Sequence, residues 1–222
     1  VLGVVNAGIV RTTPYEITVN KQAGRIDSLK VVLAADLHLG YNIGVRQMQK
    51  MVEKINEQDA DLVVFAGDIF DNEWEAVEKP DEIAEILRGI RSKYGVYACY
   101  GNHDVEEPIL AGFTFGGSES KQSSTEMDAF LEQANIRLLQ DEGVLIDGSF
   151  YLYGRPDAQR PGAAAVGAAA GAEANEGTAQ ATSAQTVSGQ SPQNQTAGAS
   201  EYTRLTPAEI TQGMDKSKPI LV

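Results

Sequence analysis

The sequence predicts an α/β fold, because apolar runs of strand length alternate with segments whose apolar residues recur at helical spacing. Residues 30–36, 62–66 and 96–100 are continuous apolar runs, which is typical of strands buried on both faces in a parallel sheet. Between them, 43–58 and 81–93 carry apolar residues every three or four positions, as amphipathic helices do. This alternation predicts a right-handed βαβαβ unit.

Shorter elements follow this unit. Residues 105–122 are rich in glycine and serine, which predicts a loop. A capping box from Ser123 to Glu126 predicts the start of a short helix. The apolar face of that helix would consist of Met127, Phe130, Leu131 and Ala134. Two short strands are expected over 143–146 and 149–153.

Residues 161–200 have a different composition from the rest of the chain. Thirteen of these forty residues are alanine and six are glycine, and the only large aliphatic side chains are Val166 and Val187. Such a segment buries too little apolar surface to offset the entropy of ordering it. We therefore expect a disordered insertion.

Residues 201–222 again have the pattern of a folded α/β chain. Thr206 and Glu209 form a capping box with a proline in the first helical position, and Gly213 suits the helix end. Pro219–Val222 predicts another buried strand. Because residues 201–222 have the same pattern as the chain before residue 161, we interpret residues 161–200 as an insertion within one domain.

Charge and cysteine content exclude several classes of protein. The net charge of −13 would repel phosphate backbones, so we expect no general nucleic-acid binding. A small phosphorylated substrate held by metal ions is compatible with this negative charge, because bound cations reverse the charge locally. The single cysteine excludes an internal disulfide and a cysteine-based zinc cluster.

The first residues are apolar enough to follow a membrane segment. Residues 1–10 resemble the tail of such a segment or a signal remnant, and an edge strand or a cloning boundary is the alternative interpretation. No run reaches the length of a membrane span. Residues 1–29 are interpreted as a lead-in to a domain that begins at residue 30.

Three polar clusters follow the three predicted strands. They are Asp36-Leu37-His38, Gly67-Asp68-Ile69-Phe70-Asp71 and Gly101-Asn102-His103-Asp104. Asp68 lies 32 residues after Asp36, and Asn102 lies 34 residues after Asp68, which is about one βα unit each. All three clusters should therefore lie at the carboxyl edge of the sheet, where open α/β sheets bind ligands.

The residue types in these clusters favour a metal site. Carboxylate and imidazole groups suit Mn, Fe or Zn. Gly67 and Gly101 allow the backbone to turn sharply beside the next side chain. Several carboxylates on one rim would repel one another without a cation. Each cluster alone is also typical of a turn or a helix cap, so the prediction rests on the three together.

In this order and spacing, the three motifs resemble those of the calcineurin-like metallophosphoesterase superfamily. The resemblance covers about residues 30–160, and residues 201–222 fit a resumed part of the same domain. It implies a four-layer α/β/β/α sandwich with two divalent metal ions, Mn, Fe or Zn, at the strand ends. It also implies hydrolysis of a phosphoester by a hydroxide that bridges the two metals.

The resemblance implies a role for each motif residue. Asp36 and His38 would bind the first metal, Asp68 would bridge both metals, and Asn102 would bind the second. His103 would be the catalytic histidine, which contacts the phosphate and assists the leaving group.

Two further carboxylates would support the site. Asp104 would orient His103, and Asp71 would support the metal ligands without binding a metal itself. The flanking sequence resembles bacterial membrane-associated phosphoesterases. This branch implies a small phosphorylated substrate, lipid- or nucleotide-linked, and a soluble catalytic domain attached to a membrane by a segment before Val1. A cytoplasmic protein is the alternative.

The chain departs from the family pattern in its histidines. The family's site needs a histidine after a later strand and a Gly-His-x-His motif, but no histidine follows His103. We expect the chain to stop just short of the first missing ligand and to be nearly inactive by itself.

Two other functions compete with the hydrolase. A non-catalytic scaffold or sensor would explain the missing histidines, although no structural need explains the five retained motif residues. A phosphatase with an aspartyl nucleophile would need Asp-x-Asp in place of Asp36-Leu37-His38. After the predicted strand 149–153, Arg155 and Asp157 are read as a surface turn, with a substrate contact as the alternative.

Overall fold

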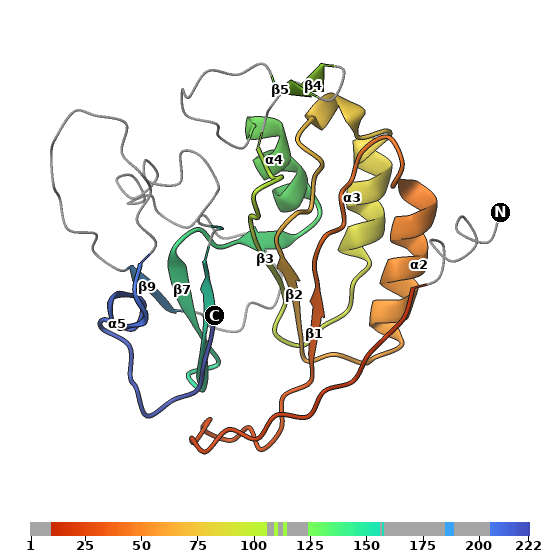
Figure 1. Cartoon of the computed structure of the whole chain (residues 1–222). Coiled ribbons are helices and arrows are strands. Elements are labelled where there is room, and N and C mark those ends of the chain that lie inside the picture. Colours follow the sequence, from red (N-terminus) through yellow and green to blue (C-terminus); the bar gives the residue numbers. More distant parts are fainter. Residues whose placement is uncertain are drawn as a thin grey trace, which may run out of the picture.

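Two four-stranded sheets packed face to face form the centre of the computed structural model of this chain (Figure 1). The structure describes residues 10–105, 109–110, 113–114, 124–155, 157, 185–188 and 205–222. Three helices cover the outer face of the first sheet and a short one packs on that of the second, so the predicted α/β fold is confirmed.

The first sheet is parallel throughout and has the strand order β1-β2-β3-β6. Its strands are β1 (Val31–Ala34), β2 (Leu62–Ala66), β3 (Val96–Cys99) and β6 (Ile136–Leu138). In the register, Ala34 lies opposite Phe65 and Phe65 lies opposite Ala98, so the carboxyl ends of three strands are level. The sequence predicted β1, β2 and β3 but missed β6, which is only three residues long.

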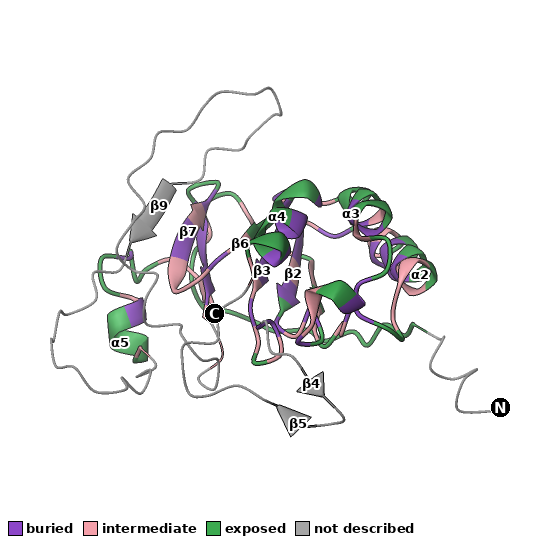
Figure 2. Ribbon diagram, turned by 90° about the horizontal axis from the view of Figure 1, so that it is seen from above, coloured by how far each residue is buried: buried purple, intermediate pink, exposed green. Residues whose placement is uncertain are grey.

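Three helices cover one face of this sheet, as Figure 2 shows from above. They are α2 (Val45–Asn56), α3 (Pro80–Arg88) and α4 (Thr125–Gln133), and a short 3-10 helix, η1 (Trp74–Ala76), precedes α3. Met48, Met51, Val52 and Ile55 form the buried stripe of α2. The second predicted helix ends at Arg88 instead of residue 93, because Gly89 caps it.

The cap of α4 lies one residue later than predicted. The Oγ of Ser124 accepts a hydrogen bond from the Met127 N–H at 3.2 Å, so Ser124 is the cap, and the predicted Ser123 lies outside the described residues. The predicted apolar face is nevertheless right, because Met127, Phe130, Leu131 and Ala134 are all buried.

The second sheet has the order β10-β8-β7-β9. Its strands are β7 (Glu142–Ile146), β8 (Phe150–Gly154), β9 (Gln185–Ser188) and β10 (Ile220–Leu221). Its inner face packs on the first sheet through residues such as Val144 and Phe150, which share one core cluster with Tyr97. Ile210 of α5 (Pro207–Ile210) packs with Met214 on the outer face. A separate two-stranded sheet pairs β4 (Ile109–Leu110) with β5 (Phe113–Thr114).

Three predictions need correction in this part of the fold. Residues 185–188, inside the segment predicted to be disordered, form β9 and pair antiparallel with β7. The other residues of 161–200 lie outside the described residues, as do residues 1–9. Leu33 is 66% exposed because β1 is an edge strand of the described sheet, so β1 is not buried on both faces. β10 is likewise half-buried.

No helix in the described part of the chain is both long and apolar enough to cross a membrane.

The predicted capping box at α5 is confirmed and has a measurable consequence. The Thr206 N–H donates to Glu209 Oε2 at 2.7 Å, and the Thr206 hydroxyl donates to the same oxygen at 2.7 Å. These hydrogen bonds, the backbone one first, hold the pKa of Glu209 below its ordinary value. Because the folded pKa is the lower one, this contribution to stability is present above about pH 4.5 and is lost as the pH falls through the folded pKa.

We expect a carbon-13 NMR titration of the Glu209 carboxyl to have its midpoint below the ordinary value of 4.5. The substitution Thr206→Ala removes the hydroxyl but keeps the backbone donor, so it should raise the midpoint part of the way. An identical midpoint in the two proteins would show that the hydroxyl contributes nothing to the cap.

Candidate metal centre

The loops after β1 and β2 are hydrogen-bonded to each other beyond the ends of the strands. The Asp36 N–H donates to the Gly67 carbonyl at 3.1 Å, and the His38 N–H donates to the Asp68 carbonyl at 3.0 Å. An isolated parallel bridge between Leu39 and Phe70 continues the pairing. The first two polar clusters therefore lie side by side at the carboxyl edge of the sheet, as the sequence predicted.

The loop after β3 is bound to the same loops. The His103 N–H donates to Asp68 Oδ1 at 3.0 Å, and the His103 carbonyl accepts the Asn72 N–H at 3.1 Å. All three predicted clusters thus meet at one edge.

Three of the predicted metal ligands have left-handed backbone conformations. The φ angles are 56° at Asp36, 47° at His38 and 52° at Asp68. Such angles are uncommon for residues other than glycine and cost of order 1–3 kcal/mol in strained cases. The hydrogen bonds between the loops hold these conformations and fix the direction of each side chain.

Two glycines allow the loops to approach this closely. Gly67 has a φ of +87°, and a Cβ built on it would lie 2.9 Å from the backbone of Gly101. A Cβ on Gly101 would lie 2.2 Å from Asp68 Oδ1, a distance that no real contact reaches. The sequence singled out both glycines for sharp turns, and the structure adds that they make room for Asp68.

Two groups of side chains could each hold a metal ion among the described residues. Asp36, His38 and Asp68 form the first group, and His38, Asp71 and His103 form the second. Within each group, one ligand atom from each residue lies within 4.8 Å of the others. The first group unites three of the four predicted ligands.

The two histidines face the same carboxylate. Their rings make an edge-to-face contact with centroids 4.9 Å apart. Asp71 Oδ1 lies 3.4 Å from Nδ1 of His38 and 3.8 Å from Nδ1 of His103. Within the described residues, both Nδ1 atoms are buried and have no hydrogen-bond partner. Buried unpaired nitrogens beside convergent carboxylates fit a divalent cation, because the lone pair of an unprotonated nitrogen can coordinate it.

Asp104 contacts the backbone and not the His103 ring. It is fully buried, and its two oxygens accept the N–H groups of Phe70 at 2.8 Å and Gly101 at 2.6 Å. Burial raises the pKa of its carboxyl, an effect that these hydrogen bonds partly oppose. The prediction that Asp104 orients His103 is therefore corrected: the carboxylate beside the His103 ring is that of Asp71.

The remaining predicted residues lie around this cluster. Asn102 is exposed, directly before His103. Arg155 donates to the Leu205 carbonyl, and the Asp157 N–H donates to the Tyr100 carbonyl at 3.2 Å, which brings the segment after β8 to the end of β3.

The sequence analysis missed Asn72, which is 8% exposed, has a φ of 62° and leaves its Oδ1 unpaired among the described residues. Its position directly after Asp71, in the second polar cluster, could have indicated that it lies at the site.

Comparison with known proteins agrees with this geometry. The family model for calcineurin-like phosphoesterase matches residues 29–159. A "Transmembrane protein with metallophosphoesterase domain" from Danio rerio is 35% identical over 114 residues, which are 51% of this chain and 25% of that protein.

Two bacterial proteins are also similar to this chain. The "Uncharacterized metallophosphoesterase YkuE" of Bacillus subtilis is 30% identical over 43% of this chain and 33% of its own length. The "UDP-2,3-diacylglucosamine pyrophosphatase LpxG" of Chlamydia trachomatis is 29% identical over 43% of this chain and 29% of its own length. The chain thus spans between a quarter and a third of the length of these relatives.

The contact between Gly101 and Asp68 can be tested by substitution. We expect Gly101→Ala to lower the free energy of unfolding by about 1–3 kcal/mol, because the added methyl group must displace Asp68. The same variant should bind Mn²⁺ more weakly than the unmodified chain. Chemical denaturation and calorimetric titration measure the two effects.

Gly44→Ala is the matched control, because a Cβ on Gly44 would meet nothing within 4 Å and its φ is −146°. Because Gly44 is the N-cap of α2, where alanine is less favourable, the substitution should lower the unfolding free energy by no more than about 1 kcal/mol. Equal effects of the two substitutions would contradict a specific contact at Gly101.

Proposed function

The chain belongs to the calcineurin-like phosphoesterase family, and on that premise we propose that it forms part of the catalytic domain of a metal-dependent phosphoester hydrolase. The observation that carries the proposal is the convergence of Asp36, His38 and Asp68 from two loops onto one point. Hydrogen bonds between the two loops hold the backbones of these residues in left-handed conformations, which fixes the direction of each side chain.

The residues present fit divalent cations, and each of four residues would have a role in holding them. Asp36 and His38 would hold the first ion, Asp68 would bridge, and Asn102 would contribute to the second. A pair of divalent cations would supply Lewis-acid polarisation of the phosphoryl group and would make water acidic enough to react at neutral pH.

His103 would handle the proton of the leaving group. Its Nδ1 faces Asp71 Oδ1 at 3.8 Å. This arrangement leaves Nε2 as the nitrogen that donates a proton to the leaving oxygen. The ring is partly accessible, with 37% of the side chain exposed, so a substrate could reach it.

We further infer that a complete two-metal centre draws on ligands beyond these residues. The chain contains only two histidines and spans a quarter to a third of its relatives' length. Residues 1–222 alone should then turn over little substrate.

The proposed substrate is a small phosphorylated molecule, lipid- or nucleotide-linked, and the proposed setting is a membrane surface. One relative named as a UDP-2,3-diacylglucosamine pyrophosphatase and another named as a transmembrane protein support these two proposals. The net charge of −13 also disfavours a long nucleic acid as substrate.

A non-catalytic scaffold of the same fold is the second candidate. The low number of histidines favours it. Metal binding by the motif residues, together with phosphodiesterase activity in a longer form of the protein, would decide for the hydrolase.

The proposed bridging ligand can be tested in the chain itself. We expect Asp68→Asn to weaken Mn²⁺ binding by about 100-fold or more in calorimetric titration, because loss of a direct ligand should exceed the 10- to 100-fold effect of removing an outer partner. Asp59→Asn is the control, since Asp59 is an exposed aspartate with nearly the same φ, 53° against 52°, at the opposite end of β2. Equal Mn²⁺ affinity in the two variants would rule out the assigned centre.

The role of His103 is tested in a form of the protein that contains the whole domain. His103→Ala should lower the turnover of bis(p-nitrophenyl) phosphate by about 10²- to 10⁴-fold, as loss of a general acid does. Metal content, measured by elemental analysis, should stay near that of the unmodified protein. Parallel loss of metal and activity would show that His103 is a ligand instead.

A further inference from the structure

We propose that Tyr100 and Asp128 form a positioning pair, which holds the loop carrying Asn102 and His103 in register with Asp68. This inference rests on the proposed function, because it concerns the geometry of the same site. Neither residue is among the motif residues, and neither was singled out from the sequence.

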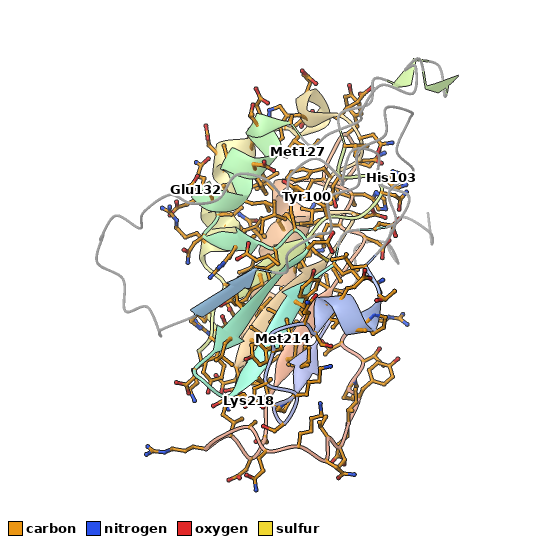
Figure 3. The ribbon with its side chains drawn as sticks, turned by 90° about the vertical axis from the view of Figure 1, so that its left-hand side faces the viewer. Tyr100, His103, Met127, Glu132, Met214 and Lys218 are labelled. Atoms are coloured by element: carbon orange, nitrogen blue, oxygen red, sulfur yellow. The ribbon has the colours of Figure 1, made fainter. Side chains whose placement is uncertain are left out.

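The two side chains make a short hydrogen bond. The Tyr100 hydroxyl donates to Asp128 Oδ1 at 2.6 Å, across 28 positions of sequence. A hydroxyl bound to a carboxylate at this distance belongs to the strong, charge-assisted class. Tyr100 is only 1% exposed, whereas Asp128 lies on the exposed side of α4. Figure 3 shows Tyr100 beneath α4 near Met127, at the end of the molecule where His103 lies.

Tyr100 is the last residue before the loop and is held at three places. Its ring packs in the core between the first sheet and the helices. Its hydroxyl is bound to α4, and its carbonyl accepts the Asp157 N–H at 3.2 Å. The backbone that enters Gly101 is therefore fixed from the helix layer and from the segment after β8.

Displacement of Tyr100 would be transmitted directly to the candidate metal ligands. The next residue, Gly101, fits so closely that a Cβ on it would overlap Asp68 Oδ1. The Gly101 N–H is bound to Asp104, and the His103 N–H is bound to Asp68. Few intervening groups could absorb a shift, since interiors this closely packed pass strain on to their neighbours.

A purely structural bond and a positioning bond have different consequences. A structural bond would contribute to stability, and its loss would lower the melting temperature while the folded molecules kept an unchanged site. A positioning bond would also alter the site within the folded molecules. Metal affinity and the environment of His103 therefore separate the two roles.

The test uses Tyr100→Phe, Asp128→Ala and Asp128→Asn. Tyr100→Phe removes the donor, and Asp128→Ala removes the acceptor from an exposed helix position where folding should be preserved. We expect each to weaken Mn²⁺ binding about tenfold, the lower end of the effect of outer partners on metal sites. The double variant Tyr100→Phe with Asp128→Ala should bind Mn²⁺ no more weakly than either single variant. Asp128→Asn keeps an acceptor oxygen and should stay within about twofold of the unmodified chain.

Glu132→Gln is the matched control, because Glu132 is an exposed acid one turn further along α4 (Figure 3). It should leave Mn²⁺ binding unchanged. Histidine NMR gives a second readout on the metal-free protein, because the chain has only two imidazoles. Tyr100→Phe and Asp128→Ala should move the His103 Cε1–H resonance, and Glu132→Gln should not.

The outcomes distinguish this inference from the proposed function. Failure of the unmodified chain to bind Mn²⁺ would count against the metal site. Unmoved His103 resonances in folded Tyr100→Phe and Asp128→Ala would overturn the positioning pair, whatever the metal result. A lowered melting temperature with unchanged resonances and unchanged Mn²⁺ affinity would show that the bond is structural only.

Discussion

The level register of three parallel strands is the constraint on which the rest of the site depends. Because β1, β2 and β3 end at the same height, the loops that follow them begin beside one another. Hydrogen bonds between these loops then continue the ladder beyond the strands, from Asp36 to Gly67 and from His38 to Asp68. Parallel pairing needs crossover connections, and the helices that make them cover one face of the sheet while the second sheet covers the other. The polar residues gather at the edge as a consequence of topology.

Close approach of these loops creates an electrostatic problem that the chain resolves in two ways. Asp104 is buried, and backbone N–H groups satisfy it, so it serves as a brace between the second and third loops. Asp36 and Asp68 instead converge with His38, and Asp71 lies beside both histidines, whose Nδ1 atoms are buried without hydrogen-bond partners in the described residues. A cation would neutralise this cluster, which makes metal binding the natural interpretation of its chemistry.

Much of this arrangement could be predicted from spacing, and the failures have local causes. The intervals between Asp36, Asp68 and Asn102 predicted that the clusters would meet, because each interval is one βα unit. Which carboxylate faces His103 could not be predicted, since Asp71 and Asp104 differ in burial and not in type. Two adjacent serines could each cap α4, and the choice of Ser124 depends on how the helix packs. Strands as short as β6 and β9 have too few residues for a periodic pattern, so their pairing partners define them.

The central claim is that Asp36, His38 and Asp68 form a metal site, and diffraction tests it most directly. Crystals of the chain soaked with Mn²⁺ would be measured at a wavelength where manganese scatters anomalously. We expect an anomalous peak about 2.0–2.3 Å from one atom of each of these three residues, the distance range of imidazole and carboxylate ligands to divalent metals. A map with no peak there, or with peaks only at other acidic residues, would contradict the assignment.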